Sequence, residues 1–393
     1  MRQQLNNYIH KDKFTYEEIN GEYSFEIKFN NQSDFFQIIT YLKSLLPENT
    51  FVIVNQFNIT NKLFGSEVDL SNCIFKEGVI LENCIFTKNV NFKDCDFIKD
   101  VSFDESKFNE KIRFHRTHFR GNTSFNNTSF NKLVDFYWAI FYKTQQFHLT
   151  DFLGYAIFSN VTFKHQVQFL YNKSSNATFI SFENTDFQQS FDISRSNFRC
   201  NIHTYGMKTN VFPSELWLYE NENTEIVETP QTIKNLKHLR ESYRRIKQEF
   251  RNIHNQIEAL KFQNYEMRVY EKELWLDKSN KKNDLIILTF NKYSNNFGKS
   301  WFTGLVFTLI ITFIFYTLFL VSIEDRLIIN LSSEGFGNYF RFFFQFLNIT
   351  SWDYKPFGIE NYIWGYSILF IGRIFIGYGY FQTIQAFRKH SKN

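Results

Sequence analysis

The side chain in this 393-residue chain that most clearly suggests a chemical role is Arg373, the one charge in the apolar stretch from 362 to 387. A charge at mid-bilayer costs several kcal/mol, so it should face a cavity or a polar partner. Upstream, an aromatic-rich segment ends in a polar turn that could border the same cavity; its residues are Thr350, Ser351, Trp352 and Asp353. This chemistry would be ion handling. The alternative is that Arg373 pairs with a carbonyl group or extends to the membrane surface.

Two other sets could bind a ligand. Cysteines recur at every eleventh position, at Cys73, Cys84 and Cys95. Without Cys-x-x-Cys pairing or nearby His ligands, we interpret them as small buried corner residues rather than as a zinc site. A basic cluster contains Arg113, Arg116 and Arg120 and is either solvated or a contact for a phosphate or a partner.

Motifs of hydrolases, phosphate loops and zinc proteases are absent from the sequence, so we expect no catalytic residues, no cofactor and no metal. The balance of 44 Lys+Arg against 40 Asp+Glu gives no argument for nucleic-acid binding. Four Cys in this length exclude a disulfide scaffold and favour a reducing compartment.

The spacing of phenylalanine, which supplies 51 residues, indicates the structural elements that carry these residues. Phe recurs at every eleventh position in two interleaved series, one from Phe64 to Phe163 and one from Phe92 to Phe169. A small residue (Cys, Ser, Thr or Ala) or a β-branched one precedes most of these Phe residues by two positions, so both face one side of an extended chain. The two pairs in a unit are five and six residues apart, which requires a corner between them. The pattern therefore predicts a square coil in which two units complete one turn, with a two-residue slip near 172–176.

This pattern resembles the pentapeptide-repeat family, in its Phe-rich variant, over Phe57–Thr204. The resemblance implies a right-handed quadrilateral β-helix of roughly six coils. Some members mimic DNA through acidic surfaces, but residues 57–204 carry 16 basic and 15 acidic side chains, which argues against mimicry here.

The segments beside the repeats are not repetitive. Residues 1–56 are expected to form an α/β cap with a strand around Phe25 and a helix at Gln32–Leu46; a separate binding module is the alternative. Residues 205–230 are read as a linker.

Residues 231–298 follow as a helical region with heptad spacing from Leu236 to Leu260. Either one long coiled-coil helix or a hairpin broken near Asn252–Asn255 fits this spacing. The stretch looks like the helix pair that follows such repeats in bacterial membrane proteins. Asp284–Phe290 suits a helix on the membrane surface, or one buried in this region.

The C-terminal region, 299–393, is expected to cross a membrane twice. Residues 301–323 carry no charge and are long enough to span it, and 362–387 would be the second span. Basic residues precede the first span and follow the second, which places both termini in the cytoplasm and the protein in the inner membrane.

Between the spans, residues 336–356 are too short for a third crossing and are expected to re-enter the membrane. Span, re-entrant helix and span resemble the two-transmembrane potassium-channel pore family, with Asp353 to Pro356 matching the tail of its filter motif. The resemblance implies a tetrameric homo-oligomer, a filter at Thr350–Asp353, and a cavity lined by Arg373 near a hinge at Gly372.

The filter position departs from that family because Thr350, Ser351 and Trp352 replace its glycines, so potassium selectivity is not expected. Gly377-Tyr378-Gly379 mimics the filter string but lies deep in the second span, and we read it as a coincidence. The sequence thus predicts an oligomeric ion channel gated by an unknown cytoplasmic protein or ligand. A membrane-anchored interaction scaffold is the alternative.

Overall fold

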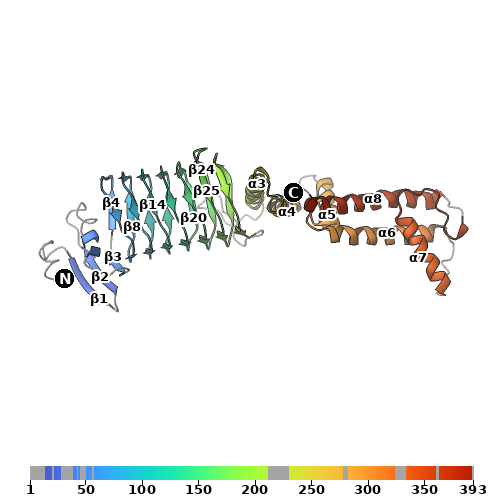
Figure 1. Cartoon of the computed structure of the whole chain (residues 1–393), viewed down its shortest axis with the longest axis horizontal. Coiled ribbons are helices and arrows are strands. Elements are labelled where there is room, and N and C mark those ends of the chain that lie inside the picture. The colour runs from blue at the N-terminus through green and yellow to red at the C-terminus, as the bar shows by residue number, and fades with distance from the viewer. Residues whose placement is uncertain are drawn as a thin grey trace. The chain divides into compact units, whose positions relative to one another are not determined.

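The computed structural model divides into two compact units, Met1–Glu249 and Phe250–Asn393, each described by itself below (Figure 1). It describes residues 14–19, 22–27, 39–41, 43–44, 50–54, 57–210, 230–277, 282–323, 333–359 and 363–391. The expected helix at Gln32–Leu46 and the expected linker lie largely outside these residues.

The first unit is a β-solenoid of about seven turns, built from four sheets with parallel pairing along the coil. The longest sheet continues an N-terminal hairpin, β1 (Phe14–Ile19) and β2 (Glu22–Ile27), through β3 (Val52–Val54), β7 (Cys73–Phe75), β11 (Asp96–Phe97), β15 (His118–Phe119), β19 (Ile140–Phe141), β23 (Thr162–Phe163), β26 (Asp186–Phe187) and β29 (Lys208–Thr209).

The next face in the coil contains β4 (Phe57–Thr60), β8 (Val79–Glu82), β12 (Val101–Ser102), β16 (Thr123–Ser124), β20 (Gln145–His148), β24 (Val167–Lys173) and β27 (Phe191–Asn197). The third contains β5 (Leu63–Phe64), β9 (Ile85–Phe86), β13 (Lys107–Phe108), β17 (Ser129–Phe130) and β21 (Asp151–Phe152). The fourth contains β6 (Val68–Asp69), β10 (Val90–Asn91), β14 (Ile112–Arg113), β18 (Val134–Asp135), β22 (Ala156–Ile157), β25 (Phe179–Ser181) and β28 (Asn201–His203).

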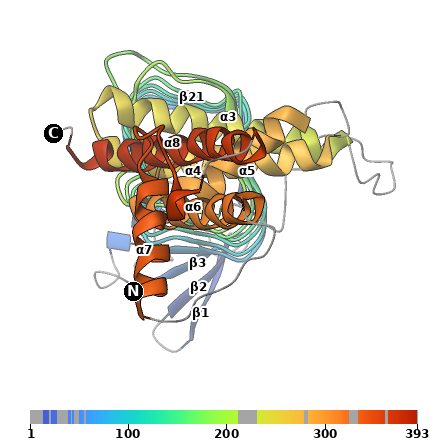
Figure 2. The same ribbon diagram turned by 90° about the vertical axis from the view of Figure 1, so that its right-hand side faces the viewer.

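The square coil predicted from the two Phe series is confirmed, and Figure 2 shows its turns nested when viewed along the axis. Residues one turn apart pair along each face, as Phe97 does with Phe119. After Phe163 the partner is Phe187, which confirms the two-residue slip. The solenoid has about one turn more than expected and reaches Thr209, because its terminal turns are built without the Phe pattern.

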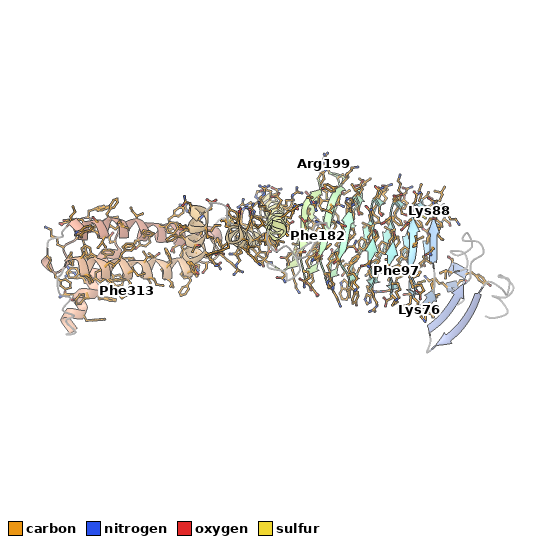
Figure 3. All side chains as sticks on the ribbon, turned by 180° about the vertical axis from the view of Figure 1, so that it is seen from behind. Lys76, Lys88, Phe97, Phe182, Arg199 and Phe313 are labelled. Carbon is orange, nitrogen blue, oxygen red and sulfur yellow. The ribbon has the colours of Figure 1, made fainter. Side chains whose placement is uncertain are left out.

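The rings fill the axis in four stacked columns. Rings one turn apart are nearly parallel, as for Phe97 and Phe119, whose centroids are 5.3 Å apart at an interplanar angle of 4°. Rings on adjacent faces meet edge to face, the other favoured aromatic geometry. Figure 3 shows Phe97 and Phe182 inside the coil, whereas Lys76 and Lys88 project from it.

The corners depend on residues with positive φ, which recur at every eleventh position from Asn61 to Tyr171. Asn is common there because its short polar side chain tolerates the left-handed region. Trp138, Leu149 and Tyr171 occupy the same corner position despite their bulk.

A hydrogen-bond ladder explains the column of Cys, Ser and Thr. From Cys84 to Thr150, each such side chain donates to a backbone carbonyl 25 positions earlier, one turn below; Thr128 Oγ1 donates to Phe103 O at 2.9 Å and Ser106 Oγ to Leu81 O at 2.8 Å. Buried carbonyls gain a second partner in this way. Ala139 and Val161 occupy the slot without a side-chain donor.

Helix α3 (Pro230–Asn252) covers the last strand of one face, β27. Ser242 Oγ accepts from the backbone N–H of Ile193 at 3.0 Å, and Arg245 Nη1 donates to Ser196 O at 2.8 Å. Unpaired strand edges invite association with other chains, and α3 satisfies this one with side chains.

The second unit contains α4 (Gln256–Leu276), α5 (Lys282–Asn295), α6 (Trp301–Ile323), α7 (Ser333–Leu347), a 3-10 turn, η2 (Pro356–Gly358), and α8 (Ile363–Ser391). The helix ending at Asn252 is separated from α4 by a turn in which His254 has a positive φ, so the single long coiled-coil helix is wrong. The break lies where the hairpin alternative placed it.

Candidate functional site

Arg373 lies on α8 and is 4% exposed, although its side chain is charged. Its Nη1 donates to the backbone carbonyl of Ile349 at 3.4 Å, and its guanidinium carbon lies 5.0 Å from the centroid of the Trp352 ring. Nε and Nη2 are buried without a hydrogen-bond partner among the described residues. Buried charges are normally paired and fully hydrogen-bonded, so these two donors call for a further partner.

The four filter-equivalent residues form an irregular loop after α7. Thr350 donates from its N–H and from Oγ1 to Asn348 Oδ1, at 3.1 and 2.8 Å. Thr350, Trp352 and Asp353 are exposed and Ser351 is half-buried. Within one chain this loop brings Trp352 to Arg373. Among the described contacts, neither Thr350 nor Asp353 touches Arg373.

The second half of α7 and the loop after it contact both α6 and α8. Tyr316 OH, from α6, donates to Tyr339 O at 2.9 Å, and Tyr380 OH, from α8, donates to Leu347 O at 3.3 Å. Tyr380 is more than halfway along α8, so the C-terminal end of α7 reaches the middle of that helix. Figure 1 shows α7 leaving the pair at a steep angle.

Close contact between α6 and α8 depends on glycines spaced seven residues apart on α8. A side chain at Gly372 would press on Phe315, and one at Gly379 would overlap Thr308 Oγ1. Gly372 is therefore a packing position in this structure. Small residues that let backbones approach are typical of helix pairs in membranes.

The basic cluster of the rod is not brought together. Arg116 Nη2 lies 2.8 Å from Asp94 Oδ2, and Arg120 Nε lies 2.8 Å from Asp96 Oδ1. Hydrogen bonding to Arg116 lowers the pKa of Asp94. Arg113 projects from another face, in β14, so the three arginines do not converge on one ligand.

The three cysteines are buried corner residues in the hydrogen-bond ladder. Cys95 Sγ donates to Leu70 O at 3.0 Å and Cys84 Sγ to Ile59 O at 3.6 Å. Burial raises the pKa of Cys73 to about 12, which makes it a poor metal ligand or nucleophile. Across the described residues, His, Cys, Asp and Glu side chains do not gather in groups of three or more that could hold a metal.

Comparison with protein families matches residues 63–107 to pentapeptide repeats (9 copies). The matched residues lie in the solenoid, so this part of the rod is built of pentapeptide repeats. No curated protein and no solved structure gives a significant match to the chain. No family match covers the C-terminal region.

This pentapeptide-repeat protein has one possible membrane-spanning helix. Among the described helices, only α6 is both long and apolar enough to cross a bilayer, judged by length and composition. A third of its most apolar stretch is buried, and large apolar side chains such as Phe313, 63% exposed, project outward (Figure 3).

Sequence reasoning missed two features of the pentapeptide-repeat protein. One is the contact between Arg373 and Trp352, which no local pattern announces. The other is a buried polar cluster where α3 meets the rod: Ser194 Oγ lies 2.7 Å from His238 Nδ1, and Asp192 accepts from Gln168 Nε2 at 2.7 Å. Asp192 and Ser194 lie within the last turns of the Phe repeat, where Asp192 pairs with the polar Gln168, and His238 lies between Leu236 and Leu239 of the heptad, so no sequence signal marked them as buried.

Proposed function

We propose that the second unit is a two-helix membrane domain with a re-entrant segment, which assembles into an oligomeric, channel-like pore that favours anions. The observation that carries the proposal is Arg373, buried with two guanidinium donors unsatisfied. In an assembly, such a residue would present positive charge to an ion pathway, repelling cations and attracting anions.

A second crossing by α8 is supported by its outer surface. Large apolar side chains are exposed along most of its length, including Trp364 at 73%, Ile374 at 58% and Ile384 at 52%. A continuous apolar surface along a helix of this length is unfavourable in water and favourable in lipid. Arg373 and Gln382 lower the apolarity of α8, but both are buried against other helices of the unit.

A re-entrant segment is supported by the contacts of Leu347 and Ile349 with Tyr380 and Arg373. Non-helical backbone can enter the hydrocarbon region only when protein shields it, and these α8 side chains occupy carbonyls of the loop.

Oligomerisation is supported by the free face of α7. Phe336, Phe340 and Phe344 lie one turn apart and are 66%, 58% and 49% exposed. A neighbouring subunit would cover this stripe, and four subunits around one axis are the arrangement that the pore resemblance implies. With both termini in the cytoplasm, the rod would meet a protein or ligand there and gate the pore.

The test is purified full-length protein in planar bilayers under a chloride gradient, comparing wild type with Arg373→Ala. We expect a wild-type reversal potential near that of chloride, shifted toward the cation potential in the variant. Arg388→Ala, a charge change at an exposed position on α8, is the control and should leave it unchanged. Absence of current in every salt, or an identical reversal potential in Arg373→Ala, contradicts the proposal.

A membrane-anchored scaffold is the second candidate, because Arg373 already contacts Ile349 O and the Trp352 ring within its own chain. The loop also lacks the glycines that a carbonyl-lined filter requires. The particle mass in nanodiscs separates the two: a monomer favours the anchor, and four chains favour the pore.

A further inference from the structure

A cavity of about 320 Å³ lies within the second unit, between α4, α5 and α8. This volume falls at the lower end of small-molecule sites, which are roughly 300–1,000 Å³. The cavity is away from Arg373 and takes no part in the proposed ion pathway, so the following inference does not depend on the proposed function.

Among the described residues that line this cavity, none carries a charged side chain. Its polar groups are all carboxamides: Gln263, Asn291, Asn295, Gln382 and Gln385. The apolar part of the wall is formed by Leu260, Met267, Phe297 and Phe381. In a chain with 84 Lys, Arg, Asp and Glu residues, such a lining selects against charged ligands, because a charge placed here would have no counter-charge.

Part of the carboxamide set is held in place by internal bonds. Asn291 Oδ1 accepts from Tyr378 OH at 2.8 Å and from Gln382 Nε2 at 3.3 Å, and Asn295 also bonds Gln382. These contacts fix the direction of the Asn291 amide and occupy its oxygen, so Nδ2 is the group of this side chain left for a ligand. Gln385 makes no hydrogen bond with any described residue and remains available for a ligand.

The wall beside these amides is a strained turn. Asn296, Phe297 and Gly298 have consecutive φ values of 52°, 57° and 84°, and Phe297 is only 5% exposed. A bulky residue in the left-handed region costs free energy, and such strain persists where surrounding contacts enforce it. Here Asn264 Nδ2 donates to Asn296 O at 3.0 Å, and Gly298 N–H donates to Asn295 Oδ1 at 2.7 Å. The turn thus holds Phe297 as a rigid side of the cavity.

We propose that this cavity binds an uncharged, planar, nucleobase-like ligand. Flat rings pack well against aromatic and thioether side chains, which Phe297, Phe381 and Met267 supply. A carboxamide offers a donor and an acceptor side by side, the pattern that pairs with the edge of a base; Asn and Gln read adenine in this way. A nucleoside is the natural probe because its base carries both ring faces and hydrogen-bonding edges.

The experiment is calorimetric titration of full-length protein in nanodiscs with adenosine, guanosine, glucose and inorganic phosphate. We expect saturable binding of one nucleoside per chain and none of glucose or phosphate. Gln263→Leu and Gln385→Leu should each weaken that binding at least tenfold, since each removes an amide of the lining. Gln263 Oε1 accepts from Arg251 Nη2 at 3.1 Å, so its Nε2 donor is the group left for a ligand. Gln256→Leu, an exposed glutamine at the start of α4 outside the cavity, is the matched control and should bind as wild type.

The thermal transition of each variant is measured alongside, so that loss of binding is separated from unfolding. If a variant does not fold, Met267→Trp, which fills the cavity without removing an amide, replaces it and should abolish binding. Binding of phosphate or glucose in preference to nucleosides overturns the proposal. So does the absence of nucleoside binding at millimolar concentration, or nucleoside binding that survives both glutamine substitutions.

Discussion

The rod and the helical unit use the same side chain against different surroundings. In the rod, stacked Phe rings such as Phe114 and Phe125 are fully buried, each sandwiched between rings one turn above and below. On α6, Phe313 is 63% exposed, and on α7 Phe336 is 66% exposed. The excess of Phe therefore has two origins: in the rod the rings form the core, whereas α6 and α7 carry exposed rings beside buried ones such as Phe319 and Phe346.

The two units also differ in what brings their elements together. In the rod, backbone pairing from each turn to the next fixes the register, and the rings follow it. Between α6 and α8 no backbone pairing is available, so the contact depends on where side chains are absent, at Gly372 and Gly379. The first unit is thus specified by a repeated sequence pattern, and the helix contact in the second by the absence of side chains at these glycines.

The largest expected effect comes from removing one ring of the rod. Phe125→Ala deletes a fully buried ring and should lower the free energy of unfolding by about 3–5 kcal/mol, measured by chemical denaturation. Phe313→Ala is the same change on an exposed ring of α6 and should alter the stability of the helical unit by less than about 0.5 kcal/mol. Equal effects would erase the distinction between the two sets of Phe.

A smaller effect is expected between the membrane helices. Gly379→Ala places a Cβ against Thr308 Oγ1 and should cost roughly 1–3 kcal/mol in the packing of α6 on α8, measured by SDS-induced unfolding in mixed micelles. Gly377→Ala, two residues away, meets nothing within 4 Å and should be neutral or slightly stabilising. If the two variants behave alike, glycine packing does not hold this pair.

The hydroxyl ladder of the rod should make a measurable but modest contribution. Thr128→Val keeps the shape and removes the bond to Phe103 O, so the expected loss is about 1 kcal/mol. Ser129→Ala removes an outward hydroxyl from the next residue and should change stability by only a few tenths of a kcal/mol. A Thr128→Val variant as stable as Ser129→Ala would show that the ladder is incidental.

The smallest effect concerns pH at the α3 junction. Burial lowers the pKa of His238 below its ordinary value near 6.5, an effect that Asp192 opposes and that Arg195 and Lys234 reinforce. As the pH falls through about 6.5 the unfolded state binds this proton first, so stability should decline toward acid.

His238→Asn should reduce this decline. Between pH 7 and 5.5, the melting temperature of the first unit should fall by on the order of 2 °C less than in the wild type. His254→Asn, at an exposed turn, should keep the wild-type slope. An unchanged slope in His238→Asn would remove His238 from the junction's pH response.

The sequence predicted the rod down to its register because every coil meets the same neighbours as the one before. The pairing of Phe97 with Phe119 could therefore be predicted from their spacing, and so could the two-residue slip before Phe187. The hydrogen bonds behind the Cys/Ser/Thr column were not inferred, because they join residues 25 apart across a turn.

The helical region was harder because local period does not say where a chain turns. Ile253 and Ile257 continue the heptad but are 64% and 67% exposed, one in the turn and one just beyond it. Arg373 could be recognised as a charge needing a partner, yet Trp352 could not be identified as that partner from spacing alone. The recurrence of Gly365, Gly372 and Gly379 was present in the sequence and would have indicated the α6–α8 contact.

The two ladder positions without a donor, Ala139 and Val161, have a mechanical consequence. A pull along the rod would load the bonds that join one turn to the next. At Cys95, Thr117 and Thr185 of this corner a side chain adds to the backbone pairing, as Thr117 does through Phe92 O at 2.6 Å, but Ala139 and Val161 add nothing. Stretched in an optical trap, the rod would part first at these turns, so its breaking point is set by two missing hydroxyls and not by the strength of its core.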